Sequence, residues 1–275
     1  MRHAIATFVT DEGIAPGALA AAVEERGFDT LIVTEHSHMP VEYEEPFAGA
    51  SAPQREYYRT LDPFVALTAA AAATHTLKLM TGVILLAQRD VFYTAKEVAS
   101  LDLVSGGRFR LGVGVGWNRR EMQHCGVDPA TRGEKMTEQI HALKQIWMND
   151  VAEFHGTFVD FAPIHSWPKP VQRPHPPIYI GGGSRAALHR LRELGDGWLA
   201  PPMPADEVAE GRRWLADNGR NDVAITMFGA PADRNVLVDY AAAGVGEAAF
   251  LLPTLPETDT LHALDKLAEI ADAPV

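Results

Sequence analysis

Residues 95–118 read AKEVASLDLVSGGRFRLGVGVGWN, and this stretch contains one complete unit of the pattern that decides the fold. Its first part, 95–104, has apolar residues at helical spacing, and Gly106 and Gly107 follow where such a helix should stop. The run 109–115 is short and apolar, which predicts a buried strand. A helix, a glycine stop and a buried strand in succession are typical of a parallel sheet covered by helices.

The same unit recurs along the chain on both sides of this stretch. Gly27, Gly195 and Gly244 occupy the same place between a helical segment and the next strand. The predicted strands are 4–9, 30–34, 77–84, 109–115, 177–181, 197–200, 223–228 and 248–252. The clearest predicted helices are 17–26, 63–74, 95–104, 133–148 and 186–194.

This count of strands favours a closed α/β barrel, the (β/α)8 TIM barrel, formed by residues 1–275 as a single domain. An open doubly wound sheet is the competing fold, but its glycine-rich dinucleotide turn should follow the first strand and is missing there. Two insertions interrupt the repeat, one after strand two (39–62) and one before strand five (153–176). Loops of this length are usually functional or disordered, and the first of them should lie over the catalytic face.

Composition and charge exclude several classes of protein. The chain has 275 residues, 47% of them hydrophobic and 22% charged, which is typical of a globular protein with one large core. Its formal net charge of −12 repels nucleic acid. The single cysteine, Cys125, fits a reducing compartment. We see neither a signal peptide nor a membrane span, so we expect a cytoplasmic protein that binds neither nucleic acid nor a membrane.

Glycine and polar residues follow several strands, at the end of a barrel where active sites form. Gly182, Gly183 and Ser184 stand between a strand and a helix, where backbone amides and the helix dipole can hold a phosphate. Arg185 adds a positive charge. A flexible turn with Ser184 as helix cap explains these residues equally well, but three consecutive glycines, 181–183, exceed what a cap needs. We therefore favour the phosphate interpretation.

A second set of candidates, Gly114, Gly116, Trp117 and Asn118, follows strand four. One Gly-x-Gly is a weak signal, because tight barrel corners also need glycine. The flat side chain of Trp117 and the amide of Asn118 suit a planar heteroaromatic ring, and core packing of Trp117 is the alternative.

Two histidines, His36 and His38, flank Ser37 directly after strand two. A group that titrates near neutral pH can transfer a proton at this place. A His-x-His pair can also bind a metal, but the other strand ends offer no third and fourth ligand, so we expect no metal site. We interpret His38 as a solvated loop residue and His36, next to Glu35, as functional.

Several motifs together resemble the luciferase-like monooxygenase superfamily, and specifically its branch of oxidoreductases that depend on the deazaflavin coenzyme F420. The resemblance covers nearly the whole chain. Its motifs are GFDTL at 27–31 leading to Glu35-His36, LDLVSGGR at 101–108, LGVGVGWN at 111–118, Arg132-Gly133, PKPVQRPHPPI at 168–178, GGGS at 181–184 and LGDGW at 194–198.

The resemblance implies a TIM barrel, often a homodimer, with an isoalloxazine-like cofactor ring lying over the strand ends. It implies a non-prolyl cis peptide at Gly82-Val83, behind that ring. It also implies which residues meet the cofactor: Glu35 and His36 approach the ring, Gly114, Gly116 and Asn118 line it, and Gly182, Gly183 and Ser184 hold its phosphate.

These observations predict an F420-dependent oxidoreductase that exchanges a hydride with a small organic substrate, with His36 as proton donor or acceptor. Some relatives that oxidise sugar phosphates or alcohols carry a glutamate where this chain has Trp117, so their substrates are not carried over. The nearest alternative is an FMN-dependent monooxygenase that uses reduced flavin and oxygen. More distant alternatives are a carrier that binds F420 without turnover and a metal-dependent barrel hydrolase. An arginine near the mouth (Arg55, Arg59, Arg89 or Arg185) would favour F420, because its glutamyl tail is acidic.

Overall fold

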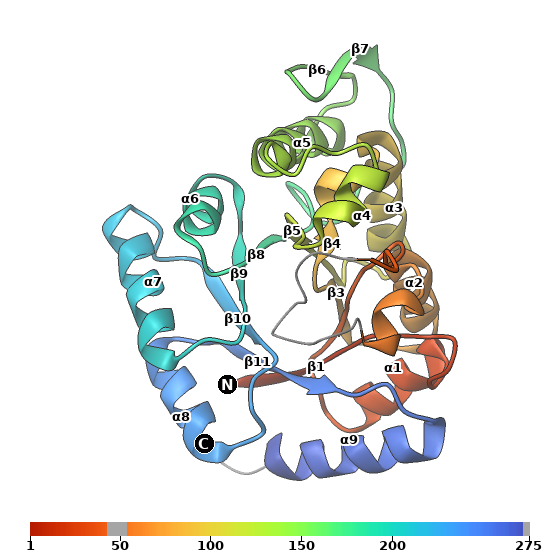
Figure 1. Ribbon diagram of the computed structural model, residues 1–275, viewed down its shortest axis with the longest axis vertical. Helices are drawn as coiled ribbons and strands as arrows, with labels where there is room; N and C mark the ends of the chain where they lie inside the picture. Colours follow the sequence, from red (N-terminus) through yellow and green to blue (C-terminus); the bar gives the residue numbers. More distant parts are fainter. Residues whose placement is uncertain (43–53, 272–275) are drawn as a thin grey trace.

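Parallel strands close into a barrel that is surrounded by helices (Figure 1), as the sequence predicts. The structure is a computed structural model, which describes residues 1–42 and 54–271. Within them the strand order is β3-β2-β1-β11-β10-β9-β8-β5-β4, and pairing of β3 with β5 closes the ring. The barrel strands are β1 (Arg2–Thr7), β2 (Thr30–Val33), β3 (Lys78–Thr81), β4 (Ile84–Leu85), β5 (Phe109–Gly114), β8 (Ile178–Gly181), β9 (Gly197–Ala200), β10 (Ala224–Phe228) and β11 (Glu247–Leu252). Because β3 and β4 are two halves of one interrupted strand, these segments occupy the eight positions of a TIM barrel.

Helices cover the outside of the barrel, and most of the core lies between them and the sheet. Side chains of Asp62, Asp90 and Asp233 accept hydrogen bonds from first-turn amides and so begin three of these helices. The helices are α1 (Pro16–Glu25), α2 (Pro63–Ala73), α3 (Val91–Val104), α4 (Arg119–His124), α5 (Arg132–Met148), α6 (Arg185–Leu194), α7 (Ala205–Asp217), α8 (Arg234–Ala243) and α9 (Glu257–Ala271). No helix in the described ranges has the length and apolar character that crossing a membrane requires.

The interior of the barrel is closed at its amino-terminal end by a buried polar network. Glu247 at the start of β11 accepts hydrogen bonds from Thr30 (2.7 Å), Thr226 (2.9 Å) and Arg110 (3.0 Å). Apolar side chains, among them Ile32 and Met80, fill the level above. The barrel can therefore open only at the carboxyl ends of its strands.

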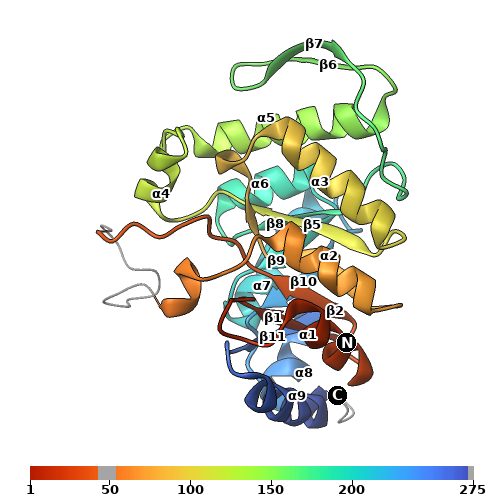
Figure 2. The same cartoon turned by 90° about the vertical axis from the view of Figure 1, so that its right-hand side faces the viewer.

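Two features differ from what the residue pattern alone predicts. The third strand, predicted as continuous over 77–84, is interrupted at Gly82 and Val83. The insertion 153–176, predicted as a loop, contributes to an antiparallel hairpin of β6 (Ala152–His155) and β7 (Asp160–Ile164) that lies outside α5 (Figure 2). The carboxylate of Glu138 in α5 accepts the amides of residues 157–159 and fixes the hairpin turn to the helix.

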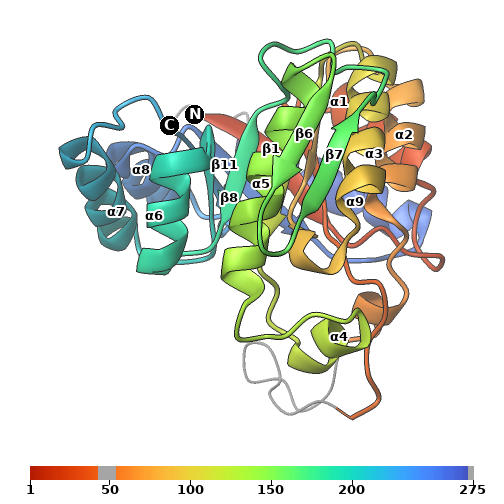
Figure 3. The ribbon, with the colours of Figure 1, turned by 90° about the horizontal axis from the view of Figure 1, so that it is seen from above.

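The described parts of the insertion after strand two, residues 39–42 and 54–62, lie on the carboxyl-end side of the barrel, as predicted. Residues 43–53 of it are outside the described residues. The rest continues into a short 3-10 helix, Arg55–Tyr58. Seen from above, α4 lies on one side of the barrel and the N-terminus on the other (Figure 3). The mouth is therefore framed by α4 and by the segment that follows β2.

Candidate active site at the carboxyl ends of the strands

The floor of the mouth is the interruption of the third strand. The Gly82-Val83 peptide bond is cis, as the resemblance predicts. The side chain of Val83 extends towards two neighbouring strands: a Cβ added to Gly114 would lie 2.5 Å from Val83 Cγ2, and one added to Gly181 would lie 2.7 Å from Val83 Cγ1. A Cβ added to Gly82 would collide with Ile32. Gly82, Gly114 and Gly181 therefore have no room for a side chain. Gly114 and Gly181 pack against the side chain of Val83, and Gly82 packs against Ile32.

One wall of the mouth holds His36 in a fixed orientation. His36 Nδ1 lies 2.9 Å from Glu121 Oε2, and the two side chains are only 7% and 0% exposed. Since a carboxylate accepts hydrogen bonds, it selects the tautomer with the proton on Nδ1 and leaves Nε2 to exchange a proton with a ligand. The rings of Tyr57 and Trp117 contact the imidazole, with centroids 5.1 and 5.8 Å away.

Glu121 is a site residue that the sequence analysis missed. It lies in the first turn of α4, and Asn118 is the N-cap of that helix, accepting a hydrogen bond from Glu121 N at 3.1 Å. The Asn118-x-x-Glu121 spacing is a helix-start signal that could have located it. Asn118 also donates to the sulfur of Met39 at 3.0 Å. The amide of Asn118 therefore positions α4, and its predicted contact with a cofactor ring stays a prediction.

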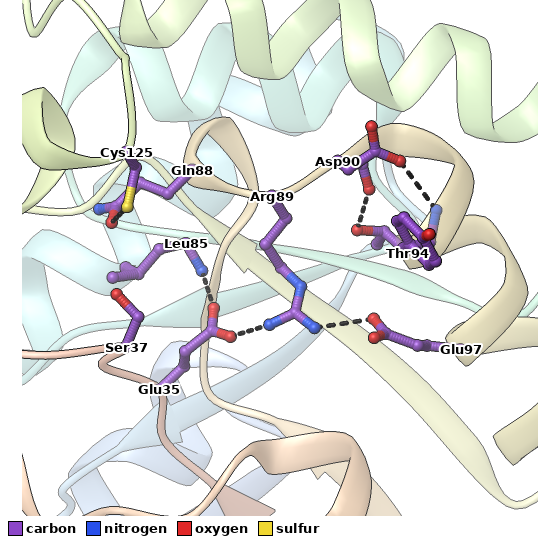
Figure 4. Close-up of a pocket in the computed structure, with 10 residues that line it drawn as sticks. Glu35, Ser37, Leu85, Gln88, Arg89, Asp90, Thr94, Glu97 and Cys125 are labelled. Atoms are coloured by element: carbon purple, nitrogen blue, oxygen red, sulfur yellow. Dashed lines mark hydrogen bonds and ion pairs between the residues drawn. The ribbon is translucent and has the colours of Figure 1, made fainter.

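Glu35 and His36 are neighbours in sequence, but the structure does not bring their side chains to one group. The Glu35 carboxylate accepts a hydrogen bond from Leu85 N (2.6 Å) and pairs with Arg89, which also contacts Glu97 at 2.7 Å (Figure 4). Burial raises the pKa of Glu35, and the charge of Arg89 opposes this shift. These contacts line a cavity of about 290 Å³ beside the mouth. In this structure Glu35 holds the second half of the interrupted strand against β2.

The predicted phosphate loop follows β8 on the same rim. Gly182 has a φ of +113°, which favours glycine, and Trp198 Nε1 supports its carbonyl from below at 2.8 Å. Ser184 caps α6, with its hydroxyl accepting from Ala187 N at 3.2 Å. Gly183 and Ser184 are exposed. The cap interpretation is confirmed, and phosphate binding stays a prediction.

Three of the four arginines considered for an acidic cofactor tail already have acidic partners. Arg55 pairs with Glu12, Arg59 with Asp11, and Arg89 with Glu35. Arg185, at the start of α6 beside the glycine turn, lies over the ring of Trp214 at 5.1 Å. Among these four arginines, Arg185 has no acidic partner in the described ion pairs, so it can bind an anion.

These residues fit a flat aromatic ligand with an anionic end. The segments that carry His36, Gly116 and Gly183 follow the carboxyl ends of β2, β5 and β8, which belong to one parallel sheet, so they share one rim. Thr34, also at this rim, is 6% exposed and its hydroxyl has no partner among the described residues. A ligand that accepts or donates one hydrogen bond there would satisfy it.

The fold and rim define an α/β-barrel protein whose site lies at the carboxyl ends of the strands. The model of the luciferase-like monooxygenase family matches residues 16–245, and the chain belongs to this family. It is 36% identical to an uncharacterized protein of Mycobacterium tuberculosis over 98% of both chains. A segment of 128 residues, 46% of this chain and 35% of the relative, is 38% identical to the FMNH2-dependent dimethylsulfone monooxygenase of Pseudomonas putida.

The fold is also shared with an enzyme that depends on coenzyme F420. The coenzyme F420-dependent tetrahydromethanopterin reductase of Methanopyrus kandleri superimposes with a TM-score of 0.73 at 16% identity, over 98% of this chain and 97% of that one. At this identity the likeness concerns the fold. Relatives and structural neighbours thus include both FMN- and F420-dependent enzymes.

Proposed function

We propose that this protein is an F420-dependent oxidoreductase that transfers a hydride between the deazaflavin and a small organic substrate. The observation that carries the proposal is the buried His36–Glu121 pair, beside Trp117 at the carboxyl ends of the strands. Reduction of a C=O or C=N bond by hydride consumes one proton, and the reverse reaction releases one. A histidine held in one tautomer at the rim is suited to handle that proton.

Residues of the rim would hold the cofactor. Its ring would lie against Val83, with Trp117 and His36 at one edge, and its phosphate would lie at Gly182, Gly183 and Ser184. When bound, the deazaflavin supplies the hydride chemistry at the central carbon of its ring. Arg185 would meet the acidic tail that F420 has and FMN lacks.

The protein's own contribution is position and proton control. Glu121 holds the imidazole of His36 so that Nε2 can give a proton to the substrate or take one from it. Tyr57 and Trp117 flank the imidazole and limit its contact with water. The rings of Tyr57 and Trp117 beside His36 favour a substrate with an apolar surface around its reacting group.

Substitution of the imidazole tests this proposal. His36→Ala should lower turnover by about 100-fold or more, since positioned acid–base groups typically contribute that much, and should leave the dissociation constant for F420 nearly unchanged. Turnover is followed by the absorbance of F420, and affinity by its fluorescence. An unchanged turnover would remove His36 from the mechanism, and no binding of F420 at all would reject the proposed cofactor.

A monooxygenase that uses reduced FMN and oxygen is the second candidate. The segment that is 38% identical to an FMNH2-dependent monooxygenase favours it. Arg185→Ala tests where the acidic tail lies: if the tail meets this side chain, the substitution should weaken binding of F420 more than binding of FMN, which has only the phosphate.

A further inference from the structure

We propose that a chain of hydrogen bonds, Glu121–Ser37–His38–His124, carries protons between His36 and the solvent. The inference rests on the proposed role of His36 as proton donor or acceptor. His36 Nδ1 is 2.9 Å from Glu121 Oε2, and Glu121 Oε1 is 3.4 Å from Ser37 Oγ. Ser37 Oγ is 2.9 Å from His38 Nδ1, and His38 Nε2 is 2.9 Å from His124 Nδ1.

The chain runs from a buried group to the surface. The side chains of His36 and Glu121 are 7% and 0% exposed, whereas Ser37 and His124 are exposed. A bound cofactor and substrate would cover the mouth and with it the direct route from His36 Nε2 to water. A lateral exit through Glu121 would remain open under these conditions.

The transfer balances because each imidazole accepts a proton on one ring nitrogen and releases one from the other, and the Ser37 hydroxyl accepts and donates through the same Oγ. The Glu121 carboxyl receives the proton on Oε2, which faces His36, and must rotate to present it to Ser37, which lies at Oε1. When Nε2 of His36 takes a proton, Nδ1 passes one to Glu121. Protonated Glu121 then gives its proton to Ser37 Oγ, and the Ser37 hydroxyl gives its own to His38 Nδ1. His38 Nε2 passes a proton to His124 Nδ1, and His124 Nε2 releases one to water. Reversal of every step delivers a proton inward, and no net charge is left behind.

The geometry of the two histidines supports a relay in preference to a metal site. Their rings are nearly parallel, with an interplanar angle of 12° and centroids 5.1 Å apart, and one nitrogen of each ring points at the other. Within 1–42 and 54–271, no three side chains of His, Cys, Asp or Glu are arranged to hold a metal ion. His38, which the sequence analysis interpreted as a solvated loop residue, thus links two elements, the segment after β2 and α4.

Variants at the outer links test the relay. Ser37→Ala and His124→Ala should each lower turnover by about tenfold or more, less than His36→Ala, because water replaces part of the path. The solvent deuterium isotope effect on turnover should increase, and added imidazole should restore the rate of His124→Ala. Ser37→Thr keeps the hydroxyl and should retain activity. His155→Ala, which removes an exposed histidine from the β6–β7 hairpin, is the matched control and should change nothing.

A second readout needs neither cofactor nor substrate. In protein with 15N-labelled histidine, exchange of the His36 Nδ1 proton with water should slow severalfold in Ser37→Ala and stay fast in Ser37→Thr. The relay would be overturned if Ser37→Ala and His124→Ala changed neither turnover nor the exchange of the His36 Nδ1 proton with water. It would also be overturned if turnover fell, imidazole did not restore it, and the exchange of that proton stayed unchanged. These results would leave the proposed function intact if His36→Ala is still inactive. Full activity of His36→Ala would instead reject the proposed function.

Discussion

At the scale of single residues, the contact between His36 and Glu121 orients the imidazole that we propose as proton donor or acceptor. Glu121→Gln keeps the size of the side chain but removes the acceptor charge, and its amide can donate to Nδ1, which favours the opposite tautomer. We expect a loss of turnover of about tenfold to 100-fold with little change in cofactor affinity. Glu134→Gln, in the exposed first turn of α5, is the control. Equal turnover of Glu121→Gln and the wild type would show that the tautomer is irrelevant.

The glycines around Val83 give a second prediction at this scale. Gly114→Ala should destabilise the fold by about 1–3 kcal/mol, because the new Cβ overlaps the Val83 side chain. Val83→Ala in the same chain should recover much of that loss. Gly17→Ala in α1 is the control, since its Cβ would meet nothing closer than 3.6 Å. Urea unfolding measures all three, and a neutral Gly114→Ala would contradict the packing described here.

Some residues of the candidate site could be predicted from the sequence and others could not, and the difference has a physical reason. His36 and the glycines directly follow strands, so their place at the rim follows from the order of elements alone. Glu121 and His124 lie on a short helix whose direction depends on tertiary packing, so their contacts with His36 and His38 could not be predicted. The family resemblance predicted that Glu35 approaches the cofactor ring. In the structure its carboxylate instead pairs with Arg89, which follows the interrupted third strand.

At the scale of elements, Glu24 fastens α1 to the turn before β3. Burial raises its pKa, but hydrogen bonds from the amides of Thr76, Leu77 and His75 lower it more, to about 2. A carboxyl with a lowered pKa in the folded state stabilises the fold above its unfolded pKa, near 4.5, and this contribution is lost as the pH falls towards 2.

The pH dependence of one variant tests this contact. The difference in the free energy of unfolding between the wild type and Glu24→Gln should be constant above about pH 5 and should shrink between pH 4.5 and pH 2. Denaturant titrations at several pH values measure it. A difference that stays constant down to pH 2 would show that the carboxylate does not hold the turn.

Elements with a strong periodic pattern were predicted well, and those set by distant contacts were not. All predicted strands are present, and the predicted glycine stops follow α1, α3, α6 and α8. The β6–β7 hairpin escaped prediction because its turn is held by Glu138, a residue of α5. The interruption of the third strand followed from the resemblance; Gly82 within the run 77–84 is the residue that permits it, but a lone glycine in a strand is a weak signal.

At the scale of the whole molecule, α3 exposes apolar side chains that a monomer would leave in water. Tyr93 and Val104 are 75% and 56% exposed, and Trp167, 55% exposed, lies beside the helix because Lys96 donates a hydrogen bond to its carbonyl. Exposed apolar groups gathered on one face mark interaction surfaces. We propose that this face joins two copies of the chain in a homodimer.

Sedimentation measures the state of assembly directly. The wild type should have twice the chain mass of 29.9 kDa, and Tyr93→Asp should shift it towards the monomer. Val238→Asp, at an exposed apolar position on α8, should remain a dimer. A monomeric wild type would remove this surface from consideration.

The barrel itself could be predicted from the sequence because the alternation of strands and helices is regular over the whole chain. The identity of the cofactor could not, because F420 and FMN share a tricyclic ring and a phosphate, and Gly182, Gly183 and Ser184 would suit either. The two cofactors differ in the acidic tail of F420, and Arg185, whose guanidinium lies over the ring of Trp214, is the residue that we propose to meet it.

Parallel fluorescence titrations with F420 and with FMN distinguish the two cofactors. An F420-dependent enzyme should bind F420 saturably and more tightly than FMN, and His36→Ala should bind F420 as well as the wild type does. Saturable binding of FMN with no binding of F420 would contradict the proposed use of F420.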